Sequence, residues 1–288
     1  MSTLDIDLHK SNLFSKGYTS LTLDELISTE FKNKLRNTVY KDDMTEMNPQ
    51  FNKLRFDCRS TLTSEEFIEI CEKYNLVPRK SDLDISNFDI NHDNYNQPPL
   101  FRYRTNLRFS DTEHHNSTLD EERISKFTNF LLEIKDKVLQ VSQFWYYSET
   151  PVNDEEIELV NQIWKKVFDV FYSDKLSIKN SPPSAPIQKT RYGLGCSLEP
   201  HEDGAENNNI FALLIYLNNR YDKSEGGYLT LGKGEDSIDV EPHIGNIAII
   251  DFTEHDPSHA VSEVTSGDGR YAFLTFIPNT EKIIYPKK

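Results

Sequence analysis

Basic charge is scarce in this chain of 288 residues, which carries 32 Lys and Arg against 47 Asp and Glu. The net charge of -15 repels polyanions and no block of Lys and Arg interrupts it, so we expect no nucleic-acid partner. The sequence also lacks an apolar run long enough for a transmembrane helix, and its first residues lack the basic and apolar regions of a signal peptide. We therefore expect no membrane association and a cytoplasmic location.

Cysteine is scarce as well. Cys58, Cys71 and Cys196 are scattered, odd in number and without a Cys-x-x-Cys pair. This pattern excludes a disulfide scaffold and a zinc knot, and it favours a reducing compartment. Apolar residues make up 36% of the chain, which is ample material for a packed core.

The last third of the chain is rich in β-branched, aromatic and aliphatic runs that alternate with turn clusters containing Gly, Asn and Asp. Several short strands at close spacing predict a sandwich or jelly roll. The expected strands are 187–198, 210–217, 227–231, 238–240, 245–252, 259–264 and 270–277.

Helical patterns dominate the part before residue 180, where capping boxes open with Thr22, Thr63, Thr118 and Asn153. They predict helices over 22–37, 63–74, from 118 through an apolar seam to Trp145, and 153–171. Residues 1–20 are expected to be an irregular lead or a first strand. We expect 81–99 to be a loop, either an active-site lid or a plain surface connection, and 181–186 to be a stiff linker. The predicted organisation is a helical and mixed support region (1–180) packed on a β core (187–288) as one integrated domain.

His201 and Asp203 stand two residues apart on an extended segment, so their side chains point to the same side. This spacing presents two ligands of a His/Asp/His facial triad. Such a triad leaves one face of a ferrous ion open. Of the histidines downstream, His259 opens an apolar strand and can face inward. His255 lies in a turn, and Pro257 prevents a helix that would make a His-x-x-x-His zinc pair. His243 lacks comparable surroundings, so we choose His259 as the third ligand.

A set of short motifs resembles the prolyl-4-hydroxylase-like iron(II)/2-oxoglutarate dioxygenases. Each motif is weak alone, but their order and spacing together are specific, and they cover roughly the last third of the chain. They are Thr190-Arg191-Tyr192-Gly193, His201-x-Asp203, Gly226-Gly227-x-Leu229, Pro242-x-x-Gly245, Phe252, His259-x-Val261 and Gly269-Arg270-Tyr271.

The resemblance implies a fold that is mostly β with some α, in which a double-stranded β-helix (jelly roll) is buttressed by the N-terminal helices. It implies Fe(II) on His201, Asp203 and His259, with 2-oxoglutarate and O2 as cosubstrates and ascorbate as a reductant. Arg270 is the implied partner of the far carboxylate of 2-oxoglutarate, and Tyr192 a second contact. Arginine suits that role because its planar fork holds a carboxylate in two charge-assisted bonds.

The substrate is less constrained by the sequence. Arg102, Arg104 and Arg108 share one face of an expected strand over 100–109, where they form either a carboxylate-binding wall beside the iron or ordinary surface ion pairs. An inward-facing wall favours oxidation of a small, carboxylate-bearing, amino-acid-like molecule by hydroxylation, desaturation or cyclisation. The alternative is a peptidyl-prolyl hydroxylase acting on a protein, although Phe276 stands where prolyl hydroxylase relatives often carry Trp.

A function of another class also fits the pattern. The same barrel occurs in metal-binding proteins that are not oxygenases, so a binding or sensor module without turnover is the third hypothesis. The presence of all four of His201, Asp203, His259 and Arg270 favours an enzyme over such a module.

Overall fold

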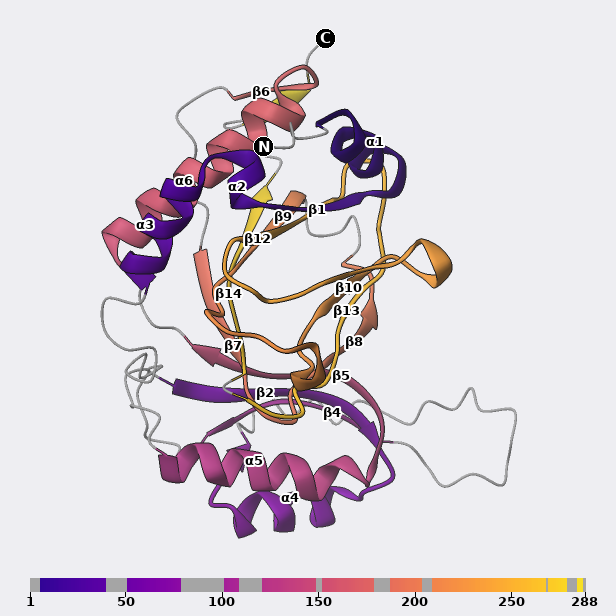
Figure 1. The fold of residues 1–288 in the computed structure, drawn as a ribbon. Helices are drawn as coiled ribbons and strands as arrows, with labels where there is room; N and C mark the ends of the chain where they lie inside the picture. Colours follow the sequence, from indigo (N-terminus) through magenta and orange to yellow (C-terminus); the bar gives the residue numbers. More distant parts are fainter. Residues whose placement is uncertain are drawn as a thin grey trace, which may run out of the picture.

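The computed structural model describes residues 6–39, 51–78, 101–108, 121–148, 152–178, 187–203, 209–267, 269–278 and 284–286. Two antiparallel sheets face each other across the middle of the molecule, and helices cover the outside (Figure 1). Within the described residues, no helix combines the length and the apolarity that crossing a membrane requires.

The larger sheet has nine strands among the described residues, and both halves of the chain contribute to it. In spatial order the strands are β1 (Tyr18–Thr22), β12 (Asn246–Asp251), β9 (Asn209–Tyr216), β14 (Arg270–Pro278), β7 (Ile187–Tyr192), β5 (Val138–Ser148), β2 (Phe51–Ser60), β4 (Phe101–Arg108) and β3 (Val77–Pro78). The N-terminal region therefore extends the β core on both sides, since β1 pairs with β12 and β5 pairs with β7.

The smaller sheet runs in the order β11 (Ile238–Val240), β10 (Leu229–Leu231), β13 (His259–Val261) and β8 (Leu198–His201). From β7 to β14 the chain passes repeatedly between the two sheets, since β7, β9, β12 and β14 lie in the larger and β8, β10, β11 and β13 in the smaller. This alternation makes a jelly-roll-like core. The predicted fold class, mostly β with helices around a jelly-roll-like barrel, is confirmed.

Two apolar clusters lie on the two faces of the larger sheet. Side chains from both sheets form the first, which continues to Phe67 and Phe130 beneath the β2–β4–β5 extension. The second fills the space between the larger sheet and the helices α3 (Thr29–Val39) and α6 (Asp154–Val167), and it contains Trp164 and Phe273. Figure 1 shows α3 and α6 side by side against the outside of the sheet. The barrel strands are therefore held from behind by packed helices, as expected for a buttressed core.

Capping accounts for the helix starts that the sequence predicts. The reciprocal capping boxes of Thr22, Thr63 and Asn153 are present at α2 (Leu23–Leu26), α4 (Ser64–Lys73) and α6. The expected helix over 22–37 is interrupted near Ile27 and continues as α3. A π-helical turn, Phe168–Tyr172, extends α6 to the predicted end.

The predicted helix from 118 to Trp145 is wrong in its second half. Helix α5 (Glu121–Lys135) ends in a turn closed by the Lys137 N–H on the Ile134 carbonyl, and Val138–Ser148 is strand β5. The segment Val-Leu-Gln-Val-Ser-Gln-Phe-Trp-Tyr-Tyr is rich in β-branched and aromatic residues, which favour a strand between two partners over the continuation of a helix. The Thr118 cap lies outside the described residues.

The first twenty residues are more regular than expected. Helix α1 (Ile6–Lys16) precedes β1, and Leu13 is fully buried. A further two-stranded sheet pairs β15 (Ile284–Pro286) with β6 (Leu176–Ile178). The expected loop over 81–99 and the expected linker over 181–186 lie outside the described residues.

Candidate functional site

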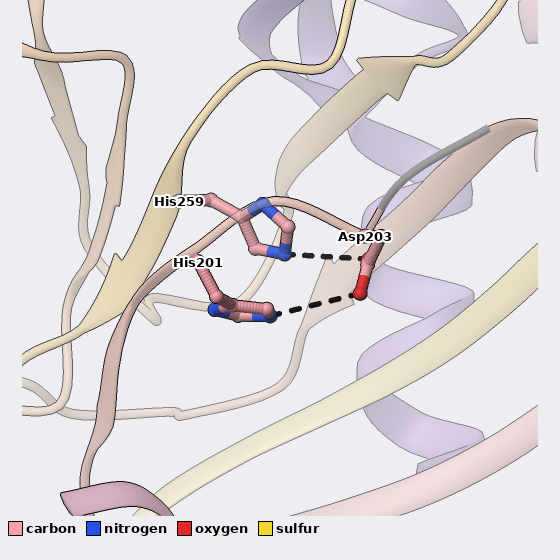
Figure 2. A group of neighbouring side chains, drawn as sticks. All are labelled: His201, Asp203 and His259. Carbon is pink, nitrogen blue, oxygen red and sulfur yellow. Dashed lines mark ion pairs between the residues drawn. The ribbon is translucent and has the colours of Figure 1, made fainter. Parts of the chain in front are cut away.

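Strand pairing brings two histidines together in the smaller sheet. His259 on β13 lies opposite His201 on β8, and their ring centroids are 4.1 Å apart. Asp203 follows β8 directly and faces both rings (Figure 2), with carboxylate oxygens 3.7 Å from Nε2 of His201 and 3.4 Å from Nε2 of His259. The potential ligand atoms of these three residues, which we call the triad, all lie within 4.8 Å of one another.

Backbone carbonyls orient both imidazoles of the triad. Nδ1 of His201 lies 2.9 Å from the Glu199 carbonyl, and Nδ1 of His259 lies 3.2 Å from the Pro257 carbonyl. Because a carbonyl only accepts hydrogen bonds, each Nδ1 is the donor, and Nε2 is the ring atom that faces Asp203. Two Nε2 atoms and a carboxylate thus converge on one point, an arrangement that a cation completes.

The pKa values of His201 and Asp203 are both lowered within the triad. Burial and the neighbouring His259 both lower the pKa of His201. For Asp203, burial acts to raise the pKa, but the hydrogen bond and charge of His259, together with His201, outweigh it and the pKa is lowered. Both shifts favour the forms that bind a metal ion, which are a neutral imidazole for His201 and an ionised carboxylate for Asp203.

The other two histidines considered from the sequence lie elsewhere. Nε2 of His255 lies 3.0 Å from the Phe14 carbonyl, which ties the 252–258 turn to the end of α1. His243 approaches its neighbour, the Ile244 carbonyl, through Nδ1 at 3.2 Å. Among the described residues, the triad is the one group of His, Cys, Asp and Glu side chains arranged to hold a metal ion.

Arg270 is buried on the inner face of the larger sheet, with 3% of its surface exposed. Its Nη2 donates to the hydroxyl of Tyr216 at 3.1 Å. The guanidinium carbon lies 4.8 Å from the ring centroid of Tyr192 and 5.0 Å from that of Tyr216. Within the described part of the chain no carboxylate forms an ion pair with Arg270, and its buried Nε has no hydrogen-bond partner. Because a buried cation without an anion is costly, this pocket suits a ligand carboxylate.

Tyr216 is a site residue that the sequence reasoning missed. It lies at the end of β9 in an otherwise apolar run and is completely buried. Burial raises the pKa of its phenol, and the Arg270 charge opposes that shift only in part. The phenol therefore stays protonated and can donate a hydrogen bond. A polar group at the end of a fully apolar strand was the available signal.

Tyr192 lies where the resemblance places it, directly opposite Arg270 in the β7–β14 register and buried. Glycine makes room beside the pair. A Cβ on Gly227, which has a φ of +76°, would lie 3.2 Å from Cβ of Arg270. Gly227 therefore packs against the aliphatic stem of Arg270, whereas a Cβ on Gly226 would meet the Glu263 carbonyl.

Of the four residues considered for substrate binding, the structure describes the side chain of Phe276 and only the strand positions of the three arginines. Phe276 is half-buried on β14 and packs against the apolar cluster between the sheets. Arg102, Arg104 and Arg108 lie on strand β4 as predicted, but their side chains fall outside the described part of the structure. Their alternating neighbours Tyr103 and Leu107 are fully buried, and Tyr103 stacks on Phe67 of α4 with ring centroids 4.3 Å apart.

Comparison with known proteins gives one sequence match. Residues 187–278, roughly a third of the chain, match the family model described as the 2OG-Fe(II) oxygenase superfamily. The resemblance drawn from the sequence motifs is thereby confirmed, and Fe(II), 2-oxoglutarate and O2 are the cofactor set of this superfamily. No curated protein matches the chain in sequence.

Solved structures resemble the chain at a low level. A Pseudomonas putida prolyl-4-hydroxylase has 11% identity and a TM-score of 0.43, over 96% of this chain and 100% of its own. A Trichoplax adhaerens prolyl hydroxylase, solved with a hypoxia inducible factor peptide fragment, has 10% identity and a TM-score of 0.45, over 96% and 90%. A Burkholderia pseudomallei oxidoreductase of the 2OG-Fe(II) oxygenase family has 12% identity and a TM-score of 0.39, over 94% and 88%. The family assignment rests on the sequence match.

Proposed function

We propose that His201, Asp203 and His259 hold the Fe(II) of a 2-oxoglutarate-dependent dioxygenase, since residues 187–278 belong to the 2OG-Fe(II) oxygenase superfamily. The observation that carries this proposal is the convergence of two Nε2 atoms and one carboxylate from β8, β13 and the segment after β8. Two nitrogens and one oxygen leave open positions on a ferrous ion, as an oxygenase requires.

The far carboxylate of 2-oxoglutarate is assigned to Arg270. Support comes from its burial, its unpaired Nε and the absence of a carboxylate partner in the described part of the chain. Tyr216, whose hydroxyl already contacts Nη2, is a second donor, and Tyr192 covers the guanidinium with its ring. The remaining apolar lining of the barrel excludes water, which strengthens an arginine–carboxylate pair.

When bound, iron and 2-oxoglutarate supply the oxidation of a C–H bond by O2, with decarboxylation of 2-oxoglutarate to succinate. The protein's part is positioning. The triad is fixed by strand pairing and by two carbonyls, while Arg270 is fixed at the start of β14 across the barrel. Both contacts therefore lie on rigid strands.

For the substrate we propose a small, carboxylate-bearing, amino-acid-like molecule. Helices α4 and α5 cover the face of β4 that contains Tyr103 and Leu107, and positions 102, 104 and 108 alternate with that face. In Figure 1 the barrel strands β8, β10 and β13 lie on the side of the extension opposite α4 and α5. Three arginine positions on that side favour an anionic substrate. A peptidyl proline in a protein is the alternative, because an extended peptide also fits across a sheet face.

The cofactor assignment is tested by adding Fe(II) and 2-oxoglutarate to the metal-free protein under anaerobic conditions. We expect the weak visible charge-transfer band of a chelated 2-oxo acid. His259→Ala should abolish the band, and Arg270→Ala should require much more 2-oxoglutarate to reach it. His9→Ala and Arg36→Ala are matched controls outside the site. Nδ1 of His9 lies 2.9 Å from Oγ1 of Thr19, between α1 and β1, and Arg36 is exposed on α3, so both variants should behave as wild type.

A wild-type protein that binds a divalent metal without giving the band would contradict the dioxygenase assignment. It would favour the binding-module hypothesis instead. If the band appears, oxygen consumption and succinate release with a panel of free amino acids and with proline-containing peptides distinguish the two substrate classes. Turnover with peptides alone would replace the small-acid proposal by the prolyl one.

A further inference from the structure

Asn218 makes two side-chain hydrogen bonds, one to each neighbour of Arg270. Its amide Nδ2 donates to the Gly269 carbonyl at 2.6 Å, and its Oδ1 accepts from the Tyr271 N–H at 2.8 Å. The side chain is buried, with 5% of the residue exposed. Asn218 therefore fixes the backbone immediately before and immediately after the arginine.

These bonds continue the sheet where its ladder ends. Strands β9 and β14 pair as far as Tyr216 opposite Ala272, and one further backbone bond runs from the Leu217 N–H to the Tyr271 carbonyl. Beyond that point the side-chain amide of Asn218, in place of a backbone peptide, donates one hydrogen bond to the residue before β14 and accepts another from β14 itself. Asn and Gln carry an amide donor and an amide acceptor on one planar group, as a peptide unit does, and Asn is the shorter of the two.

Asn218 is itself anchored by the Pro242-x-x-Gly245 turn. Its N–H donates to the Pro242 carbonyl at 3.1 Å, and its carbonyl accepts from the Ile244 N–H at 2.7 Å. The Gly245 N–H also donates to the Tyr216 carbonyl at 3.3 Å. A continuous set of hydrogen bonds thus joins this turn, Tyr216 and the start of β14.

From this geometry we propose that Asn218 is a positioning residue that sets Arg270 for the far carboxylate of 2-oxoglutarate. The inference rests on the proposed function, because it concerns the cosubstrate pocket of that site. Asn218 acts through backbone groups and needs no contact with the ligand. A displacement of about 1 Å at a reacting or binding group lowers efficiency by about a hundredfold in other enzymes, so a small shift of Arg270 is sufficient for a measurable effect.

The test measures equilibrium binding of two ligands to the Mn(II)-loaded protein by calorimetry. 2-Oxoglutarate carries the far carboxylate, and pyruvate is a 2-oxo acid without it. In Asn218→Ala we expect 2-oxoglutarate affinity to fall about tenfold or more, while pyruvate affinity changes by less than about twofold. Asn218→Asp keeps the acceptor for the Tyr271 N–H but cannot donate to the Gly269 carbonyl. It should therefore also lower the affinity for 2-oxoglutarate more than the affinity for pyruvate, and it replaces Asn218→Ala if the alanine variant does not fold.

Asn153→Ala is the control, because Asn153 caps α6 outside the barrel, where its Oδ1 accepts from the Glu156 N–H at 2.9 Å, and it has no contact with the Arg270 pocket among the described residues. It should bind both ligands as wild type does. Equal weakening of 2-oxoglutarate and pyruvate in the Asn218 variants would indicate a general structural role and overturn the inference, as would unchanged 2-oxoglutarate affinity. A wild-type protein that binds neither ligand would overturn the proposed function itself, and this inference with it.

Discussion

A buried ion pair links the helical layer to the barrel. Nζ of Lys189 on β7 lies 2.7 Å from Oε1 of Glu156 in the first turn of α6, and their side chains are only 8% and 3% exposed. Removing one partner leaves the other charge buried without compensation. For Lys189→Met we expect a loss of about 3–5 kcal/mol in the free energy of unfolding.

The double variant Lys189→Met/Glu156→Gln separates charge from packing. Glutamine can still accept the Asn153 N–H that Glu156 Oε2 accepts at 3.1 Å, so the helix cap is kept. Because the double variant has no charge left at either position, we expect it to recover most of the lost free energy of unfolding, to within about 1–2 kcal/mol of wild type.

Urea unfolding followed by circular dichroism measures the two single variants, Lys189→Met and Glu156→Gln, and the double variant. Lys126→Met provides a control, because its partner Glu122 is 75% exposed and such a surface pair contributes less than about 1 kcal/mol. The reasoning would be refuted if Lys189→Met cost no more than Lys126→Met. It would also be refuted if the double variant lost the sum of the two single changes, since the charges would then be independent.

Three further expectations concern Gly227, the domain organisation and the thiols. Gly227→Ala should weaken 2-oxoglutarate binding and lower the thermal midpoint more than Gly234→Ala does. Both glycines have a positive φ, but only a Cβ on Gly227 would press on Arg270, because a Cβ on Gly234 would meet nothing within 4 Å. Equal effects of the two substitutions in a thermal melt would contradict this expectation. We propose that residues 1–180 and 187–288 form one folding unit, so the segment 187–288 alone should fail to fold, as judged by limited proteolysis, because β12 and β7 lose their partners β1 and β5. Burial raises the pKa of Cys71 to about 12, and Cys196 is also buried. We therefore expect neither thiol to react with a thiol reagent at pH 8 until urea unfolds the protein. Rapid labelling of Cys71 or Cys196 in the native state, measured by mass spectrometry, would be inconsistent with this burial.

The barrel strands were predictable because each is a short apolar run bounded by turn residues. Every strand from β7 to β14 overlaps a predicted segment, although the one strand predicted over 187–198 is two, β7 and the start of β8, in different sheets. Three capping boxes marked real helix starts. The convergence of the triad was predictable in the same way, since strand alternation fixes which side His201 and Asp203 face.

The failures that affect the sheet and the site involve partners that are distant in the sequence. Val138–Trp145 fits a helical repeat as well as a strand, and only pairing with β2 and β7 decides for the strand. Strand β2 was not predicted at all. The polar end of an apolar strand marked Tyr216 as unusual but did not identify its partner Arg270, which lies 54 residues away. Asn218 gave no local signal of its role, because its partners Gly269 and Tyr271 lie 51 and 53 residues away. Side-chain hydrogen bonds across a barrel are set by register, which composition does not encode.

Strand β1 has a consequence for how the protein is made. Among the described strands it lies at the edge of the larger sheet and pairs with β12, in the register Tyr18 to Ile250, so this partner is synthesised long after β1. On the ribosome, β1 must therefore wait without this partner until β12 has emerged. An unpaired edge strand is a site for pairing with other chains, so slow or interrupted translation before β12 should favour aggregation over productive folding.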